Sequence, residues 1–222
     1  MSIATRDYET HIPEPRMARF LFADTRMAPV WLILRLWLGY QWLQAAWGKW
    51  TEGGWVGKGA GGAVKGFAQG AIAQTTGEHP QVTGWYADFL ENVVVPNAAL
   101  FSYLVIFGET LVGIALVLGA FTGIAAFFGV FMNASYIFAG VAGANPLMAI
   151  VGILLILAWR VAGWWGLDRW IMRAVGVPRA PGKPSTGVAI EGAVLAPLER
   201  PLDVRGWSLP SPPNTLSEPR PP

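Results

Sequence analysis

The stretch NAALFSYLVIFGETLVGIALVL, residues 97–118, decides the fold because it carries a single formal charge, that of Glu109. Two uncharged runs follow it closely: FTGIAAFFGVFMNASYIFAGVAGA at residues 121–144 and PLMAIVGILLILAW at residues 146–159. Helical runs of about 20 apolar residues match the roughly 30 Å hydrocarbon thickness of a bilayer. These stretches therefore predict membrane-spanning helices.

A fourth long run lies upstream, at residues 29–50, and the turn at residues 119–122 is too short to join anything but antiparallel neighbours. We therefore expect an all-α integral membrane protein, an antiparallel four-helix transmembrane bundle. Its predicted spans are about residues 29–50, 97–118, 121–144 and 146–166. Residues 51–96 form the predicted extracytoplasmic loop, residues 1–28 an N-terminal segment, and residues 171–222 a proline-rich tail.

The composition agrees with a membrane location and excludes several chemistries. Charged residues make up 14% of the chain, where a soluble domain has about 25%. The net charge of +2 and the lack of a dense Lys/Arg tract argue against a nucleic-acid partner. The absence of cysteine excludes disulfides, covalent haem and cysteine-ligated iron–sulfur clusters within the chain. The two histidines, His11 and His79, fall outside the predicted spans, which argues against haem between the helices; we find no metal or flavin motif.

The orientation follows from the positive charges that flank the spans, because Lys and Arg stay on the cytoplasmic side. The flanking cations at the two ends of the chain are Arg6, Arg16, Arg19, Arg26, Arg160, Arg169, Arg173, Arg179 and Lys183. The loop at residues 51–96 supplies only Lys58 and Lys65. We therefore expect a multi-pass protein of the plasma membrane with both termini in the cytoplasm.

Two segments outside the spans have the pattern of helices that lie along a membrane surface. In the loop, Val82, Trp85, Phe89 and Val93 recur at helical spacing. This stretch is either a lid on its own bundle or a substrate-gating or partner-docking element. Residues 17–22 are either a short interfacial helix or a solvated lead-in.

Arg35 and Glu109 are the two charges that lie deepest in the predicted spans. At about 1.5 Å per residue, Arg35 lies roughly 10 Å and Glu109 roughly 14 Å from the cytoplasmic side. An isolated charge at such depth costs from about 3 to more than 10 kcal/mol, so we expect these two to form an ion pair. Asn133 is placed to hydrogen-bond that pair, whereas Lys49 sits at a span end, from where it can extend to the interface.

Two interpretations of these polar residues stay open, with solute transport as a weaker third. The first is a structural ion pair that fixes the bundle. The second is a quinone-headgroup pocket in which Glu109 exchanges protons and Arg35 or Asn133 donates to a carbonyl oxygen. Tyr136 lies on the same side of its span as Asn133. The candidate catalytic residues are thus Glu109 and Arg35, and the candidate quinone-binding residues are Arg35, Glu109, Asn133 and Tyr136.

The run FGETLVGIALVLGAFTGIAA, residues 107–126, joins a buried acid to a glycine-turned hairpin, and RLWLGYQWLQAAWGKW, residues 35–50, precedes it. Together with residues 79–166, these stretches resemble the DoxX/DoxD family of four-helix membrane proteins, over about residues 29–170. Some members of that family are the membrane subunit of thiosulfate:quinone oxidoreductases. The resemblance implies that Arg35, Glu109 and Asn133 occupy the family's characteristic polar positions.

These observations lead to a predicted subunit of a quinone-linked electron-transfer complex. A site for thiosulfate or another reduced sulfur donor would lie largely on a partner, since this chain offers no thiol. The alternative is an accessory structural subunit of a respiratory or photosynthetic complex, without chemistry of its own. In either case the segment at residues 178–222, with eleven prolines, is expected to dock against other membrane subunits.

Overall fold

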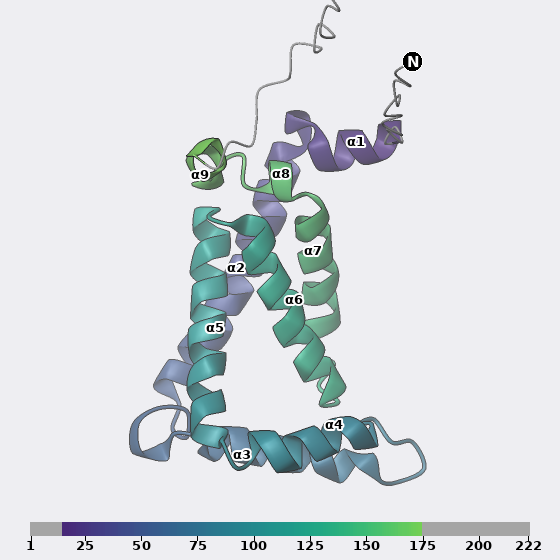
Figure 1. Cartoon of the computed structure of the whole chain (residues 1–222), viewed down its shortest axis with the longest axis vertical. Helices are drawn as coiled ribbons and strands as arrows, with labels where there is room; N and C mark the ends of the chain where they lie inside the picture. The colour runs from purple at the N-terminus through teal and green to yellow at the C-terminus, as the bar shows by residue number, and fades with distance from the viewer. Residues whose placement is uncertain (1–14, 175–222) are drawn as a thin grey trace, which may run out of the picture. The chain divides into compact units, whose positions relative to one another are not determined.

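The computed structural model describes residues 15–174, and every regular element in that range is a helix, as predicted. Four long helices occupy the positions of the predicted spans (Figure 1): α2 (Ala28–Thr51), α5 (Ala98–Leu118), α6 (Thr122–Phe138) and α7 (Asn145–Leu157). The expected tail and the first 14 residues lie outside the described residues.

The last two apolar runs are longer than the helices that they form. Within residues 15–174, α5 is the one helix whose length and composition suffice to cross a membrane, and α6 and α7 are apolar but shorter. The run expected to span residues 121–144 leaves the helix after Phe138, and Gly140 adopts φ +78°, a left-handed conformation that favours glycine. The last run breaks at Ala158, between α7 and the short α8 (Trp159–Ala162). The four-span bundle stays a prediction.

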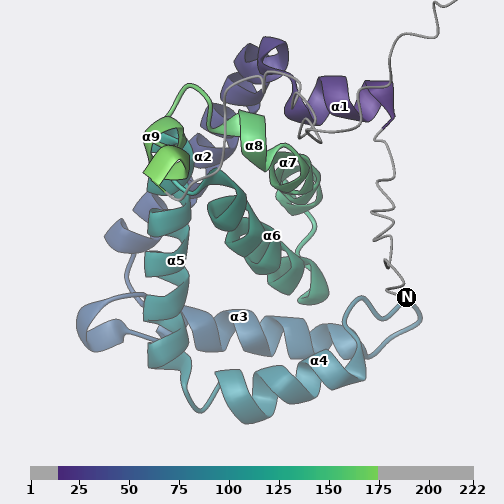
Figure 2. The same cartoon turned by 45° about the horizontal axis from the view of Figure 1, so that its top comes forward.

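The long helices form two closely packed pairs. Helix α2 packs along α5, and α6 packs along α7. Glycines bring the first pair together: a Cβ atom on Gly39 would lie 3.2 Å from the Gly113 carbonyl oxygen, and one on Gly113 would lie 2.7 Å from Leu43 Cγ. Small residues permit such an approach where no hydrophobic effect drives helices together. Helices α5 and α6 share a short turn and diverge from it (Figures 1 and 2).

A second layer crosses the open end of these pairs. It consists of α3 (Gly62–Ile72), α4 (Gly84–Phe89) and a π-helical turn, η4 (Leu90–Val94), with the short 3₁₀ turns η2 (Gly57–Gly59) and η3 (Ala73–Thr75) (Figure 2). Burial raises the pKa of the Tyr86 phenol above its ordinary value, so its hydroxyl stays protonated and donates to the Ser135 carbonyl of α6 at 2.7 Å. The layer is thereby joined to α6, and the helical pattern predicted at residues 82–93 is confirmed.

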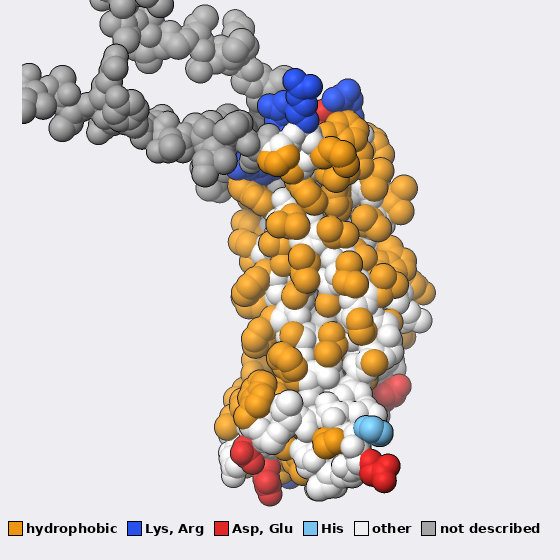
Figure 3. Space-filling model, turned by 90° about the vertical axis from the view of Figure 1, so that its right-hand side faces the viewer, with side chains coloured by type: hydrophobic (Ala, Val, Ile, Leu, Met, Phe, Trp, Pro, Cys, Tyr) orange, Lys and Arg blue, Asp and Glu red, His pale blue; other side chains and the backbone are white. Residues whose placement is uncertain are grey.

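The exterior between the two ends is apolar. Exposed large side chains of α5 and α6 include Leu104, Phe107, Leu111, Phe127 and Phe131. Figure 3 shows such side chains over the face between a cationic group at one end and acidic side chains at the other. An apolar belt of this extent is far larger than the patches of a few hundred Å² on typical soluble monomers.

At the end opposite α3 and α4, a buried arginine closes the α5 helix. Arg35 is 1% exposed, and its Nη1 donates to the Leu116 carbonyl at 2.8 Å and the Val117 carbonyl at 3.4 Å, while Nη2 donates to Trp165 at 3.3 Å. The first two are carbonyls of the last turn of α5, where the regular i+4 N–H partners are missing. A cation there is also favoured by the negative end of the helix dipole.

A buried aspartate caps the first turn of α6, just as the buried arginine caps the last turn of α5. Asp168, at the start of α9 (Asp168–Ala174), accepts from the backbone N–H of Phe121 at 2.6 Å and of Thr122 at 3.0 Å. These are the first N–H groups of α6, where an anion is favoured. A buried cation and a buried anion therefore hold the two sides of the turn at residues 119–121.

We predict that Asp168→Ala lowers the free energy of unfolding by about 3 kcal/mol, because it strips two buried N–H groups of a charged acceptor. Unfolding of the purified protein in detergent, followed by circular dichroism, measures this loss. The matched control is Asp88→Ala, which removes an exposed carboxylate of α4. Equal stability of the two variants would contradict the proposed role of Asp168.

Candidate functional site

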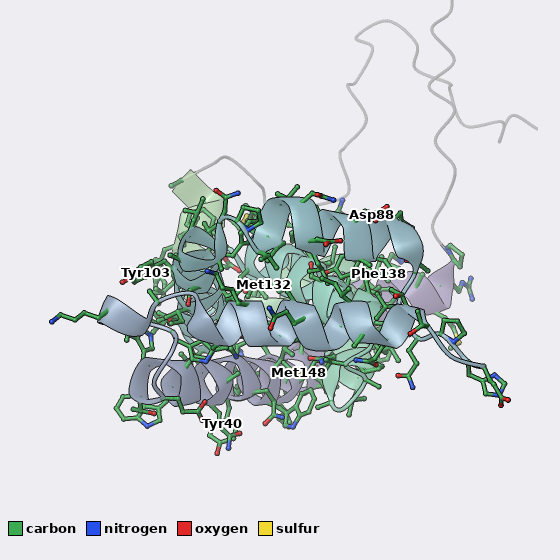
Figure 4. All side chains as sticks on the ribbon, turned by 90° about the horizontal axis from the view of Figure 1, so that it is seen from below. Tyr40, Asp88, Tyr103, Met132, Phe138 and Met148 are labelled. Atoms are coloured by element: carbon green, nitrogen blue, oxygen red, sulfur yellow. The ribbon has the colours of Figure 1, made fainter. Side chains whose placement is uncertain are left out.

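A cleft of about 1310 Å³ opens where α5 and α6 diverge. Its walls come from α2, α5, α6 and α7, and α3 and α4 contribute to it from the end of the bundle seen in Figure 4. Most of the lining is apolar, including Val112, Met132 and Met148. The same cleft reaches exposed side chains such as Leu111 and Phe128, so it is accessible from the apolar exterior between the two helices.

Glu109 is the acid inside this cleft. It lies in α5 and is 1% exposed. Its Oε1 accepts hydrogen bonds from Lys49 Nζ at 2.9 Å and from the Tyr136 hydroxyl at 2.7 Å. Its Oε2 also lies 2.9 Å from Lys49 Nζ, but no described residue gives that oxygen a hydrogen bond of good geometry. One carboxylate oxygen thus keeps acceptor capacity.

Lys49 is the functional candidate that the sequence interpretation missed. We expected its ammonium group to extend to the membrane interface, but it turns inward from the last turn of α2 to Glu109, and its side chain is 18% exposed. The Trp55 ring covers the ammonium at 5.2 Å. Its spacing from Arg35 could have indicated this inward position, because 14 residues of α-helix return to almost the same face.

The predicted Arg35–Glu109 ion pair is wrong. Arg35 lies level with the last residues of α5, where it binds backbone carbonyls, and Glu109 pairs with Lys49 instead. The depth estimate assumed that the two helices end at one level, whereas α2 begins well beyond the end of α5 (Figure 1). Arg35 is therefore remote from the polar group that it was expected to neutralise.

The other two predicted residues lie on α6. Tyr136 contacts Glu109 directly, and Phe67 of α3 packs edge-on against its ring at a centroid distance of 6.0 Å. Asn133 lies about one helical turn away and is fully buried, yet no described residue hydrogen-bonds its amide nitrogen or oxygen. The indole N–H of Trp42, which lines the cleft, is unpaired in the same sense. Because buried polar atoms usually have hydrogen-bond partners, the unpaired groups of Asn133 and Trp42 are exceptions.

This arrangement can bind a molecule that is apolar over most of its length and polar at one end. Lys49 carries N–H groups beyond those used by Glu109, and Glu109 Oε2 can accept. In the part of the chain that the structure describes, no group of three or more histidine, aspartate or glutamate side chains is placed to hold a metal ion.

Residues 15–174 form an all-helical unit with an apolar exterior and a charge pair inside a laterally open cleft. A family model, DoxX, matches residues 30–142, just over half of the chain. The chain belongs to the DoxX family and is a membrane protein, as the resemblance implied. The match contains Lys49, Glu109, Asn133 and Tyr136. No curated protein and no solved structure matches the chain.

We predict that Lys49→Met lowers the free energy of unfolding by about 3 kcal/mol, because it leaves a buried carboxylate without its cation. Adding Glu109→Gln to that variant removes the unpaired charge and should recover most of the loss. Thermal unfolding of the single and double variants gives the coupling energy. Lys58→Met, at an exposed position, is the control. Purely additive losses would mean that the two side chains do not stabilise each other.

Proposed function

We propose that this DoxX-family protein is the membrane subunit of a quinone-linked electron-transfer complex and that its α5–α6 cleft binds the quinone. One observation carries the proposal: a buried charge pair, Glu109 with Lys49, lies with Tyr136 inside a mostly apolar cleft. A quinone has the matching form, a polar ring with a long apolar chain.

The dimensions and polarity of the cleft support this ligand class. Ligand cavities usually measure roughly 300–1,000 Å³, so about 1310 Å³ leaves room for a ring and the first part of a tail. The tail would leave between Leu111 and Phe128 toward lipid. The amide side chains of Gln41 and Gln44 also line the cleft and add donors and acceptors.

Each polar side chain has a role that its contacts suggest. Lys49 donates to a ring oxygen, and Glu109 Oε2 accepts from a ring hydroxyl in the reduced form. Tyr136 holds the carboxylate through its hydrogen bond to Oε1. Asn133 does not line the cleft, so its unpaired amide is assigned no contact with the ligand. When bound, a quinone accepts two electrons and two protons, and Glu109 is the residue placed to hold a proton.

Arg35 has no part in this proposed binding. Its guanidinium is committed to the carbonyls at the end of α5, so we assign it to the stability of the turn. The electron donor, thiosulfate or another reduced sulfur compound, would bind on a partner subunit, for which residues 178–222 remain the proposed docking segment.

We also propose that α2, α5, α6 and α7, with α8, cross the plasma membrane as four spans. The end that carries α1 (Arg16–Ala23) would face the cytoplasm and the α3–α4 layer the extracytoplasmic side. Six arginines at the first end against Lys58 and Lys65 in the loop support this orientation.

We predict that Glu109→Gln weakens binding of ubiquinol-1 about tenfold or more in the protein reconstituted in nanodiscs, because a charged acceptor is lost. Tyr136→Phe should weaken it less, since it only frees the carboxylate. Equilibrium titration with ligand counting by mass spectrometry measures both.

The controls for that titration are Glu91→Gln and Tyr40→Phe. Both side chains are exposed, and Tyr40 points away from the bundle (Figure 4). Unchanged affinity and unchanged quinone turnover in Glu109→Gln would reject the quinone site and leave the role of accessory structural subunit.

We predict opposite labelling of two single-cysteine variants, Thr76→Cys near the α3–α4 layer and Arg173→Cys in α9. Because the chain has no cysteine, a membrane-impermeant maleimide reports only the introduced thiol. In intact cells Thr76→Cys should react, and Arg173→Cys should react only after lysis. The reverse pattern would invert the proposed orientation.

A further inference from the structure

The end of the bundle opposite the α3–α4 layer is strongly cationic. It carries α1 (Arg16–Ala23), a 3₁₀ turn η1 (Thr25–Met27), α8 and α9. Its exposed cations are Arg16, Arg19, Arg26, Arg160, Arg169 and Arg173. Across residues 15–37 and 118–174 the acids are Asp24, which pairs with Arg26, and Asp168, which is buried. Figure 3 shows cationic side chains at this end and acidic ones at the other.

Large apolar and aromatic side chains are exposed beside these arginines. Met17 is 74% and Trp170 63% exposed, and Phe20 and Trp165 are also open. The guanidinium of Arg26 lies 5.2 Å from the centre of the Phe20 ring. Arginine together with exposed tryptophan is typical of the interface between acyl chains and headgroups.

Helix α1 is held across the end of α2 by contacts of its own. The indole N–H of Trp31 donates to the Leu21 carbonyl at 2.8 Å, and Phe22 stacks on the Trp31 ring. At the bend, Asp24 accepts from the Arg26 backbone N–H at 2.9 Å and from its guanidinium. Those hydrogen bonds keep the pKa of Asp24 below its usual range.

Helix α1 also contacts α8, so the arginines of both belong to one layer (Figures 1 and 2). This layer continues the apolar exterior of the long helices at the level where they end. The opposite end carries Glu52, Glu78, Asp88 and Glu91 against Lys58 and Lys65. The two ends therefore differ in the sign of their charge.

We propose that the layer of α1, α8 and α9 binds the headgroups of anionic phospholipids, with its arginines on the phosphates and Met17 and Phe20 at the acyl boundary. Guanidinium groups bind phosphate oxygens in pairs of hydrogen bonds. Exposed Met and Trp side chains among the arginines favour a lipid surface over an acidic protein surface, whose contact would leave them against polar groups. The inference rests on the membrane location and not on the quinone site.

The test counts lipids that the purified full chain retains in detergent, by native mass spectrometry. The probes are dioleoylphosphatidylglycerol and dioleoylphosphatidylcholine at equal concentration. The wild type should retain the anionic lipid about tenfold more, and raised salt should reduce that preference. Arg16→Gln with Arg19→Gln should reduce it at least threefold.

Two matched variants make the result specific. Lys58→Gln with Lys65→Gln removes the same charge at the other end and should leave the preference unchanged. Arg16→Lys with Arg19→Lys keeps the positive charge and should retain most of the preference for the anionic lipid. This variant distinguishes a loss of charge from misfolding as the cause of the effect of the Gln variant. Equal retention of both lipids by the wild type, or an equal loss in the control, would overturn the proposal.

Discussion

The structure depends on the way the α5–α6 hairpin is held. Buried charges fix its two helices together at the turn, whereas the helices diverge toward the other end. At the turn, Arg35 binds the last carbonyls of α5 and Asp168 binds the first N–H groups of α6. Each charge meets the helix end whose dipole has the opposite sign, so two ionised groups are buried with compensation from the backbone itself. This fixes the two helices together at one end. Beyond the turn the two helices diverge (Figures 1 and 2).

Where α5 and α6 diverge, Glu109 takes over as the connection. It binds Lys49 on α2 and Tyr136 on α6, so one carboxylate bridges three helices across the cleft. The α3–α4 layer adds a second tie through Tyr86 and Ser135. Polar contacts thus connect the helices on the two sides of the cleft. The same group that stabilises the bundle is the one that presents an unpaired acceptor, so structural and binding roles coincide in Glu109.

The sequence predicted much of this correctly. Long apolar runs located the four main helices, and the DoxX resemblance was confirmed. The prediction failed for the partners of the charges. Arg35 and Lys49 lie on one face of α2 about 21 Å apart along its axis, at roughly 1.5 Å per residue. To choose between them as the partner of Glu109, one must know how far α2 is shifted along α5. The periodicity of the sequence describes one helix at a time and does not give that shift. The breaks after Phe138 and at Ala158 were hidden because apolar composition continues through both.

The amino-acid sequence by itself determined the helical class, the apolar exterior and the presence of buried charges, because hydrophobic length and charge spacing act within one helix. Only the tertiary structure decided which cation neutralises Glu109, and that Arg35 and Asp168 close the turn instead. Those outcomes depend on how far one helix slides along another, which the glycine contacts at Gly39 and Gly113 set. Interhelical offset is a property of packed surfaces, and a linear pattern of residues does not carry it.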